Sequence, residues 1–233
     1  MTWQPQGPTD CVQTSLSVLL GALGRPTPVS KVKKDVPLHT NTQGVVIGTT
    51  FAHAALHLRR LGFRTTIHTT DIDLLDRTWE GLDAKELRKK LTQRKKFIRH
   101  PFLDEEAVEA YAEGYVSFVR AEGRIKHPVL TTKYLHRLLE KAPFIAAVSK
   151  QYLVSCSKKR FVGKTGKAVF DDVRGQTNTH AIVVAGYRDG RFLIIDSSAP
   201  NARAGRRWLN AEHLIGAICL AETEWDNLVI TAV

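Results

Sequence analysis

Residues 179–198 read T-H-A-I-V-V-A-G-Y-R-D-G-R-F-L-I-I-D-S-S, a pattern typical of two antiparallel strands joined by a tight turn. The first strand begins near His180 and the second ends at Asp196. The Asp189-Gly190 pair supplies the turn between them. Because two paired strands of this length can hold His180 and Asp196 side by side, the hairpin predicts a histidine that is oriented by a carboxylate.

A second stretch, far away in the sequence, supplies a thiol. Residues 4–20 read Q-P-Q-G-P-T-D-C-V-Q-T-S-L-S-V-L-L, in which a loop rich in proline and glycine leads into an apolar helix. Cys11 stands where this helix begins, and Thr9 or Asp10 is available as its N-cap. The helix dipole and the unpaired N–H groups of the first turn favour thiolate over thiol at this point. Cys, His and Asp in this chain order are the parts of a thiol nucleophile, its base and the group that orients the base.

The order and the local sequences of these residues resemble the papain-like cysteine peptidases, and most closely the bacteriocin-leader-processing (double-glycine) branch. In that branch an Asp-Cys pair opens the first long helix, as Asp10-Cys11 does here. A histidine at the start of a strand, His180 here, precedes an apolar run, a Gly-Tyr pair and a second strand that ends in Asp. The chain has Gly186-Tyr187 and Asp196 at those points. The strand before the catalytic histidine resembles A-P-F-I-A-A-V-S-K at residues 142–150.

The resemblance implies an oxyanion-stabilising glutamine about six residues before the cysteine. Pro5 occupies that position, and Gln4 and Gln6 lie on either side of it. We favour Gln6, because the Gly7-Pro8 turn could absorb one residue of spacing, and Gln4 stays as the alternative. A side-chain amide near the attacked carbonyl stabilises a transition state by about 3 kcal/mol, so this assignment matters.

The resemblance further implies a cysteine hydrolase that cleaves a peptide or amide bond. Cys11 would attack the carbonyl, His180 would take and return the proton, and Asp196 would hold the imidazole. Gln6 or Gln4 would stabilise the oxyanion together with the backbone N–H of Cys11. This mechanism needs no cofactor. The expected partner is a peptide or protein substrate.

Two other functions stay open. An acyltransferase would form the same acyl-thioenzyme and resolve it with an amine in place of water. A catalytically silent binding module would use a basic helix to hold an acidic protein or nucleic acid. Val12, which stands where the family usually has glycine, and the displaced glutamine both favour the silent module.

The predicted elements give an α+β fold. We expect a single papain-like domain over residues 1–233, with a helical lobe at about 1–141 and a β-rich lobe at about 142–233. The nucleophile helix of the first lobe would pack on an antiparallel sheet of the second. Residues 24–48 and 155–178 are predicted to be loops. The second is expected to be a mobile loop that leads into His180, and long loops of this kind often form lids or binding edges. Helices are expected at about 10–23, 50–61, 83–98, 104–122 and 131–141, and strands near 63–69, 143–149, 180–187, 191–196, 215–221 and 227–232.

Other candidate site residues have weaker surroundings. Cys156 has the cations of residues 158–160 beside it, which would lower its pKa, but no partner histidine nearby in the sequence. Cys219 falls in the apolar run I-G-A-I-C-L and is expected to be a core residue. His53 and His57 are four residues apart on a predicted helix and could face a metal together, but no third ligand is evident. We therefore expect no metal.

Composition limits the class of protein. At 233 residues, with 43% hydrophobic and 24% charged residues, the chain is typical of one globular domain. Three cysteines without regular spacing do not form a disulfide framework and suit a reducing compartment. The sequence has no signal-peptide pattern and no apolar run as long as a membrane span. We expect a cytoplasmic protein.

A net charge of +11 makes this a basic protein and predicts attraction to acidic surfaces or polyanions. Much of this charge lies in residues 85–99, K-E-L-R-K-K-L-T-Q-R-K-K-F-I-R, which form an amphipathic helix pattern with a basic face. Three interpretations stay open: a solvated face, a site for an acidic protein or peptide substrate, or a site for nucleic acid. No aromatic interleaving or zinc-finger spacing supports nucleic acid.

Overall fold

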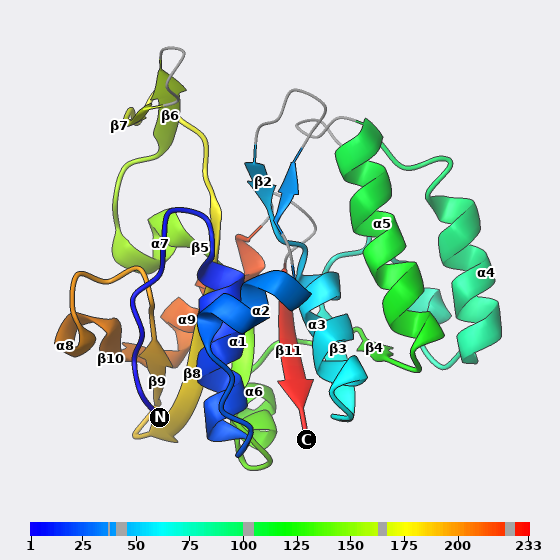
Figure 1. The fold of residues 1–233 in the computed structure, drawn as a ribbon, viewed down its shortest axis with the longest axis horizontal. Coiled ribbons are helices and arrows are strands. Elements are labelled where there is room, and N and C mark those ends of the chain that lie inside the picture. Colours follow the sequence, from blue (N-terminus) through cyan, green and yellow to red (C-terminus); the bar gives the residue numbers. More distant parts are fainter. Residues whose placement is uncertain (37, 41–45, 100–104, 163–166, 222–226) are drawn as a thin grey trace.

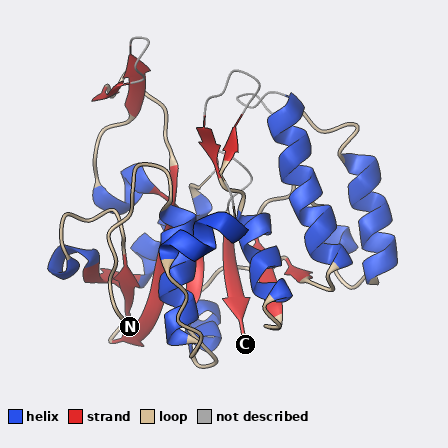
Figure 2. Ribbon diagram, viewed as in Figure 1, coloured by secondary structure: helices blue, strands red, loops and turns tan. Residues whose placement is uncertain are grey.

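A seven-stranded sheet forms the centre of the fold, and helices cover both of its faces (Figure 1, Figure 2). The computed structural model describes residues 1–36, 38–40, 46–99, 105–162, 167–221 and 227–233. The strands of the sheet span Thr65–Thr69 (β3), Arg124–Lys126 (β4), Phe144–Ser149 (β5), Thr179–Arg188 (β8), Arg191–Ile195 (β9), Arg206–Asn210 (β10) and Leu228–Ala232 (β11). They lie in the order β10-β9-β8-β5-β11-β3-β4, and only β3 and β4 pair in parallel. The predicted α+β class is confirmed.

The helices expected from the sequence are all present. Each of the five begins and ends close to its predicted bounds: Cys11–Ala22 (α1), Phe51–Arg60 (α3), Ala84–Arg94 (α4), Glu105–Arg120 (α5) and Thr132–Leu139 (α6). Further helices, which the sequence analysis did not predict, span Val29–Asp35 (α2), Lys150–Val154 (α7), Ala202–Gly205 (α8) and Ala211–Cys219 (α9), with a 3₁₀ turn at Arg77–Trp79 (η1).

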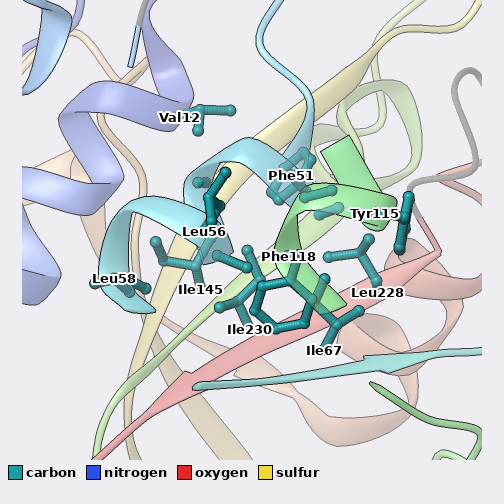
Figure 3. Packing of buried hydrophobic residues seen from close by; sticks show 14 of the residues in the cluster. Val12, Phe51, Leu56, Leu58, Ile67, Tyr115, Phe118, Ile145, Leu228 and Ile230 are labelled. Carbon is teal, nitrogen blue, oxygen red and sulfur yellow. The ribbon is translucent and has the colours of Figure 1, made fainter. Parts of the chain in front are cut away.

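The larger core cluster fills the face of the sheet that α1, α3 and α5 cover. Side chains of three strands, Ile67, Ile145 and Ile230, meet Leu56 of α3 and Phe118 of α5 (Figure 3). All five side chains are buried. Because α1 belongs to this layer, the packing of the core fixes the position of the helix that carries the candidate nucleophile.

The opposite face of the sheet holds a second cluster. Phe144, Ala146 and Val148 alternate along β5 with the residues of the first cluster, as the pleat of a strand requires. They are packed with Leu214 and Ile218 of α9. Both faces of β5 are therefore covered, which explains why its sequence is apolar throughout.

The predicted strand at 215–221 is wrong, because this segment belongs to α9. Leu214, Ala217 and Ile218 recur at helical spacing and are buried against the sheet. A short apolar run cannot be distinguished from a strand by its hydrophobicity alone, and contact with β5 decides the outcome here. Cys219 accordingly ends a helix and is half-buried rather than a strand residue of the core.

Two segments expected to be loops contain regular structure. Residues 24–48 hold α2 and the short pair His39–Thr40 (β1) and Val46–Gly48 (β2). Residues 155–178 hold the antiparallel pair Lys159–Val162 (β6) and Lys167–Phe170 (β7), which projects away from the main sheet (Figure 1). Both pairs were missed because strands this short carry too little alternation to stand out from a polar loop.

We predict that α9 stabilises the fold through its buried face. Leu214→Ala should lower the free energy of unfolding by about 2–5 kcal/mol, since Leu214 is 0% exposed and its removal leaves a cavity. Leu220→Ala is the matched control, because Leu220 follows the same helix and is 44% exposed. Urea denaturation measures both. Equal losses for the two variants would contradict the helical packing of this segment.

Candidate active site

Helix α1 lies against β8, and this contact brings Cys11 to His180. Ser15, one turn after Cys11 on α1, donates its hydroxyl to the backbone carbonyl of Ala181 at 3.2 Å. The Cys11 thiol is in hydrogen-bond contact with the His180 side chain and with the backbone of Val12 and Ala181. A first-turn residue of a helix and the second residue of a strand therefore meet, although 169 positions separate them in the sequence.

The carboxylate of Asp196 holds the other side of the His180 ring. Nε2 of His180 is 2.8 Å from Oδ1 of Asp196. The pairing of β8 with β9 makes this contact, since His180 lies at the start of one strand and Asp196 directly follows the end of the other. Because Nε2 is occupied by Asp196, Nδ1 is the ring nitrogen left for Cys11. The two side chains are almost inaccessible to solvent, with residue exposures of 2% and 1%.

The ionisation of the three groups is coupled. Burial lowers the pKa of His180, but the hydrogen bonds to Asp196 and Cys11 outweigh burial and raise this pKa to about 9. Burial raises the pKa of the Cys11 thiol, but the hydrogen bond and charge of His180 outweigh it and leave the pKa below its ordinary value. Burial likewise raises the pKa of Asp196, but the hydrogen bond and charge of His180 outweigh burial and hold this pKa well below its usual range. This combination favours thiolate, imidazolium and carboxylate at neutral pH.

Further contacts fix the Asp196 carboxylate. Oδ1 accepts hydrogen bonds from the backbone N–H of Ser198 at 2.9 Å and from its hydroxyl at 2.7 Å. Oδ2 accepts from Nη2 of Arg207 at 3.3 Å. The indole N–H of Trp3 donates to the backbone carbonyl of Asp196 at 2.8 Å. The D-S-S sequence carries a local turn signal for Ser198, whereas nothing in the sequence ties Arg207 or Trp3 to this corner.

The two candidate oxyanion glutamines point to different places. The backbone N–H of Gln6 donates to the carbonyl of Ser197 at 3.1 Å, and the Ser197 hydroxyl donates to Oε1 of Gln6 at 2.6 Å. Gln6 thus lies at the corner that holds Asp196, and its amide nitrogen has no hydrogen-bond acceptor among the residues that the structure describes. Nε2 of Gln4 instead donates to the hydroxyl of Ser17 on α1 at 3.2 Å.

Asp10, the residue before the candidate nucleophile, forms an ion pair at the start of α1. Asp10 occupies the N-cap position of α1, but its side chain makes no capping hydrogen bond. The carboxylate is buried and pairs with Nζ of Lys33 on α2 at 2.5 Å. Of the two predicted N-cap candidates, Thr9 and Asp10, the structure places Asp10 at that position, but the ammonium of Lys33 engages its carboxylate in place of a first-turn N–H. This ion pair ties α2 to the start of α1.

The remaining candidate residues lie outside this site. His53 has Nδ1 at 2.6 Å from the Thr50 hydroxyl, and its ring contacts the His39 ring at a tilt of 50°, with 4.7 Å between ring centroids. Burial, followed by the neighbouring charges, lowers the pKa of His53 to about 4. Within the described parts of the chain, no three or more His, Cys, Asp or Glu residues are grouped closely enough to hold a metal ion. Burial raises the pKa of Cys219.

Solved structures similar to this chain include two peptidases. No protein-family model and no curated protein matches the chain. The peptidase domain of Streptococcus ComA, a bi-functional ABC transporter involved in a quorum-sensing pathway, is 16% identical with a TM-score of 0.42, and the match covers 100% of this chain and 97% of that chain. A C39-like peptidase from Bacillus anthracis is 11% identical with a TM-score of 0.45, and the match covers 99% and 93% of the two chains.

We predict that Cys11 is the most reactive of the three thiols. Its pKa is lowered by His180, whereas that of Cys219 is raised by burial, so iodoacetamide at neutral pH should modify Cys11 first. Mass spectrometry of partly modified protein gives the order, with Cys156 as an internal reference. His180→Ala should slow modification of Cys11 and leave the other two rates unchanged. An inert Cys11 in the intact protein would refute the assignment.

Proposed function

We propose that the protein is a cysteine peptidase that cleaves a peptide or amide bond through Cys11, His180 and Asp196. One observation carries the proposal: the His180 ring lies between the Cys11 thiol and the Asp196 carboxylate, with Nε2 at 2.8 Å from Oδ1. A lone helical cysteine is more often a packing residue. A thiol with a lowered pKa beside a base that a buried carboxylate orients is the arrangement that nucleophilic catalysis needs.

The steps follow from this arrangement. The Cys11 thiolate attacks the carbonyl carbon of the substrate, and the carbonyl oxygen takes on negative charge. The imidazolium of His180 gives its proton to the leaving amine, and the acyl group stays on sulfur. The neutral imidazole then takes a proton from water, which attacks the thioester and releases the acid. Asp196 keeps the ring in one orientation throughout and stabilises its charged form.

Gln6 is the glutamine that we assign to the oxyanion. Its Oε1 is held by Ser197 at the Asp196 corner, which leaves the amide N–H groups to donate to a substrate oxygen. Gln4 is engaged with Ser17, farther along α1. The backbone N–H of Cys11, in the first turn of α1, supplies a second donor, since first-turn N–H groups have no partner within their own helix.

The same acyl-thioenzyme would serve an acyltransferase. Release of free acid from a peptide substrate without any added amine supports hydrolysis, and turnover only with an added amine supports acyl transfer.

The expected partner is a peptide or protein. No helix in the described ranges is long and apolar enough to cross a membrane. The cytoplasmic location stays a prediction.

We predict a bell-shaped dependence of kcat/KM on pH, with its alkaline limb near pH 9. As the pH rises through the pKa of His180, about 9, the imidazolium loses the proton that the leaving amine needs, so activity falls. As the pH falls through the lowered pKa of Cys11, the thiolate is protonated, so activity falls again. Hydrolysis of a fluorogenic peptide across the pH range measures both limbs. An alkaline limb near pH 6.5, the ordinary value for histidine, would refute the ion pair.

His180→Ala should reduce kcat by about three to four orders of magnitude, because the variant lacks the base and the group that lowers the Cys11 pKa. His180 is buried, so a thermal melt must show that the variant still folds. His136→Ala is the control, since His136 is half-buried on α6 and contacts Tyr187 rather than the site. Near-normal turnover by a folded His180→Ala protein would contradict the mechanism.

The two glutamines can be separated by a matched pair of variants. Gln6→Ala should lower kcat by about 10²-fold to 10³-fold with little change in KM, as expected when a donor to the oxyanion is removed. Gln4→Ala should leave kcat within about twofold of the unaltered protein, because its amide is engaged with Ser17. A larger loss for Gln4→Ala than for Gln6→Ala would reverse the assignment.

A further inference from the structure

The β6–β7 pair and its flanks form an arm, defined here as residues 158–176. The arm leaves the body of the protein after α7 and returns to it just before β8 (Figure 1). Its two strands form a sheet of their own and do not join the central sheet. A two-stranded hairpin of this size has little stability alone, so backbone and side-chain contacts at its base must hold it.

Asp171 supplies those contacts. Its Oδ2 accepts from Nε of Arg160 at 2.7 Å and from Nε of Arg174 at 2.9 Å, and its Oδ1 accepts from the backbone N–H of Arg174 at 2.9 Å. Gly175 packs so closely on the Asp171 carbonyl that no side chain would fit there. The base of the arm is therefore a built structure.

The base of the arm is also attached to the candidate site. Gln151 and Asn178 exchange two hydrogen bonds, of 2.5 Å between their side chains and 2.9 Å to the Asn178 backbone N–H. Lys150 donates its backbone N–H to the carbonyl of Asn178 at 3.1 Å. Asn178 precedes His180 by two residues. The base of the arm therefore lies close in the chain to the base of the candidate triad.

The arm exposes apolar side chains beside its cations. Phe170 is 65% exposed and Val173 is 82% exposed. Nζ of Lys159 lies 4.9 Å from the centroid of the Phe170 ring. Single exposed apolar residues are common, but two of them among the cations of one arm give that arm a mixed apolar and cationic character.

The net charge of the chain lies in two segments. The arm sequence has six of the 34 cationic residues and two of the 23 acidic ones. Residues 85–99 have eight cationic residues and one acidic residue. The rest of the chain has 20 cationic and 20 acidic residues, whose charges cancel. The arm and residues 85–99 therefore hold the whole net charge of +11. In residues 85–99, Lys95 is paired with Glu109 and Glu113 of α5. Helix α4 and the arm lie at opposite sides of the fold (Figure 1).

We propose that the arm binds an acidic segment with apolar side chains in the peptide substrate, at a distance from the scissile bond. This inference rests on the proposed peptidase function. Lys158 and Lys159 attract the acidic side chains, and Phe170 and Val173 receive the apolar ones. The basic face of α4, far from the triad, is a solvated surface with no part in substrate binding.

The test uses a short fluorescein-labelled peptide in which glutamate alternates with leucine, and full-length protein with Cys11→Ala, so that the probe is not cleaved. Fluorescence anisotropy gives Kd. Lys158→Glu with Lys159→Glu should weaken binding by about tenfold or more, and Phe170→Ser with Val173→Ser by a similar factor. The matched control, Lys89→Glu with Lys96→Glu on and beside α4, reverses as many charges and should change Kd by less than about twofold.

Three results would overturn the proposal: unchanged Kd in the arm variants, an equal loss in the α4 control, or a single-stranded oligonucleotide that binds the arm more tightly than the peptide does. Circular dichroism of each variant checks that it folds. The peptidase proposal and the arm proposal are tested separately by iodoacetamide modification of Cys11, in arm variants that keep the thiol. A reactive Cys11 with arm-independent peptide binding refutes the arm alone. An inert Cys11 with arm-dependent binding refutes the peptidase and leaves the arm as a binding site.

Discussion

The packing of α1 on β8 is the contact on which the candidate site depends. Cys11 and His180 belong to segments that lie far apart in the sequence, and the proposed chemistry needs both of them. The hydrogen bond from Ser15 to the carbonyl of Ala181 and the apolar cluster beneath α1 fix the relative position of helix and strand. Because that core is close-packed, a helix shift large enough to separate thiol from imidazole would disrupt many other contacts.

The electrostatics follow from this placement. Burial alone would make all three groups of the site neutral, since it lowers the pKa of His180 and raises those of Cys11 and Asp196. Each shift is reversed by the neighbouring group, so the charged forms depend on one another. Ser198 and Arg207 donate to the Asp196 carboxylate and thereby keep the negative charge that the imidazolium needs. Loss of any one member should therefore change the ionisation of the others.

Local patterns in the sequence were sufficient for the parts of the site that lie on one element or one hairpin. The β8–β9 hairpin and the start of α1 were predicted correctly because a tight turn and a loop-to-helix boundary leave strong local signals. The lining of Asp196 by Trp3 and Arg207 was not predictable, since it depends on long-range packing. The segment at 215–221 was mistaken for a strand because only its contact with β5 distinguishes the two structures. The sequence of the arm predicts a loop, because contacts of Asp171 and backbone hydrogen bonds hold its base and its short strands show little periodicity.

The proposed mechanism requires His180 and Cys11 to exist as an imidazolium–thiolate pair, and nitrogen NMR of the His180 ring can detect this pair. The chemical shifts of ring nitrogens distinguish imidazolium from either neutral tautomer. We expect both ring nitrogens of His180 to carry a proton at pH 7 and one of the two protons to be lost near pH 9. In Cys11→Ser the pKa of His180 should fall toward the ordinary value of histidine. A neutral imidazole at pH 7 in the unaltered protein, with a titration that Cys11→Ser does not change, would contradict the proposed mechanism.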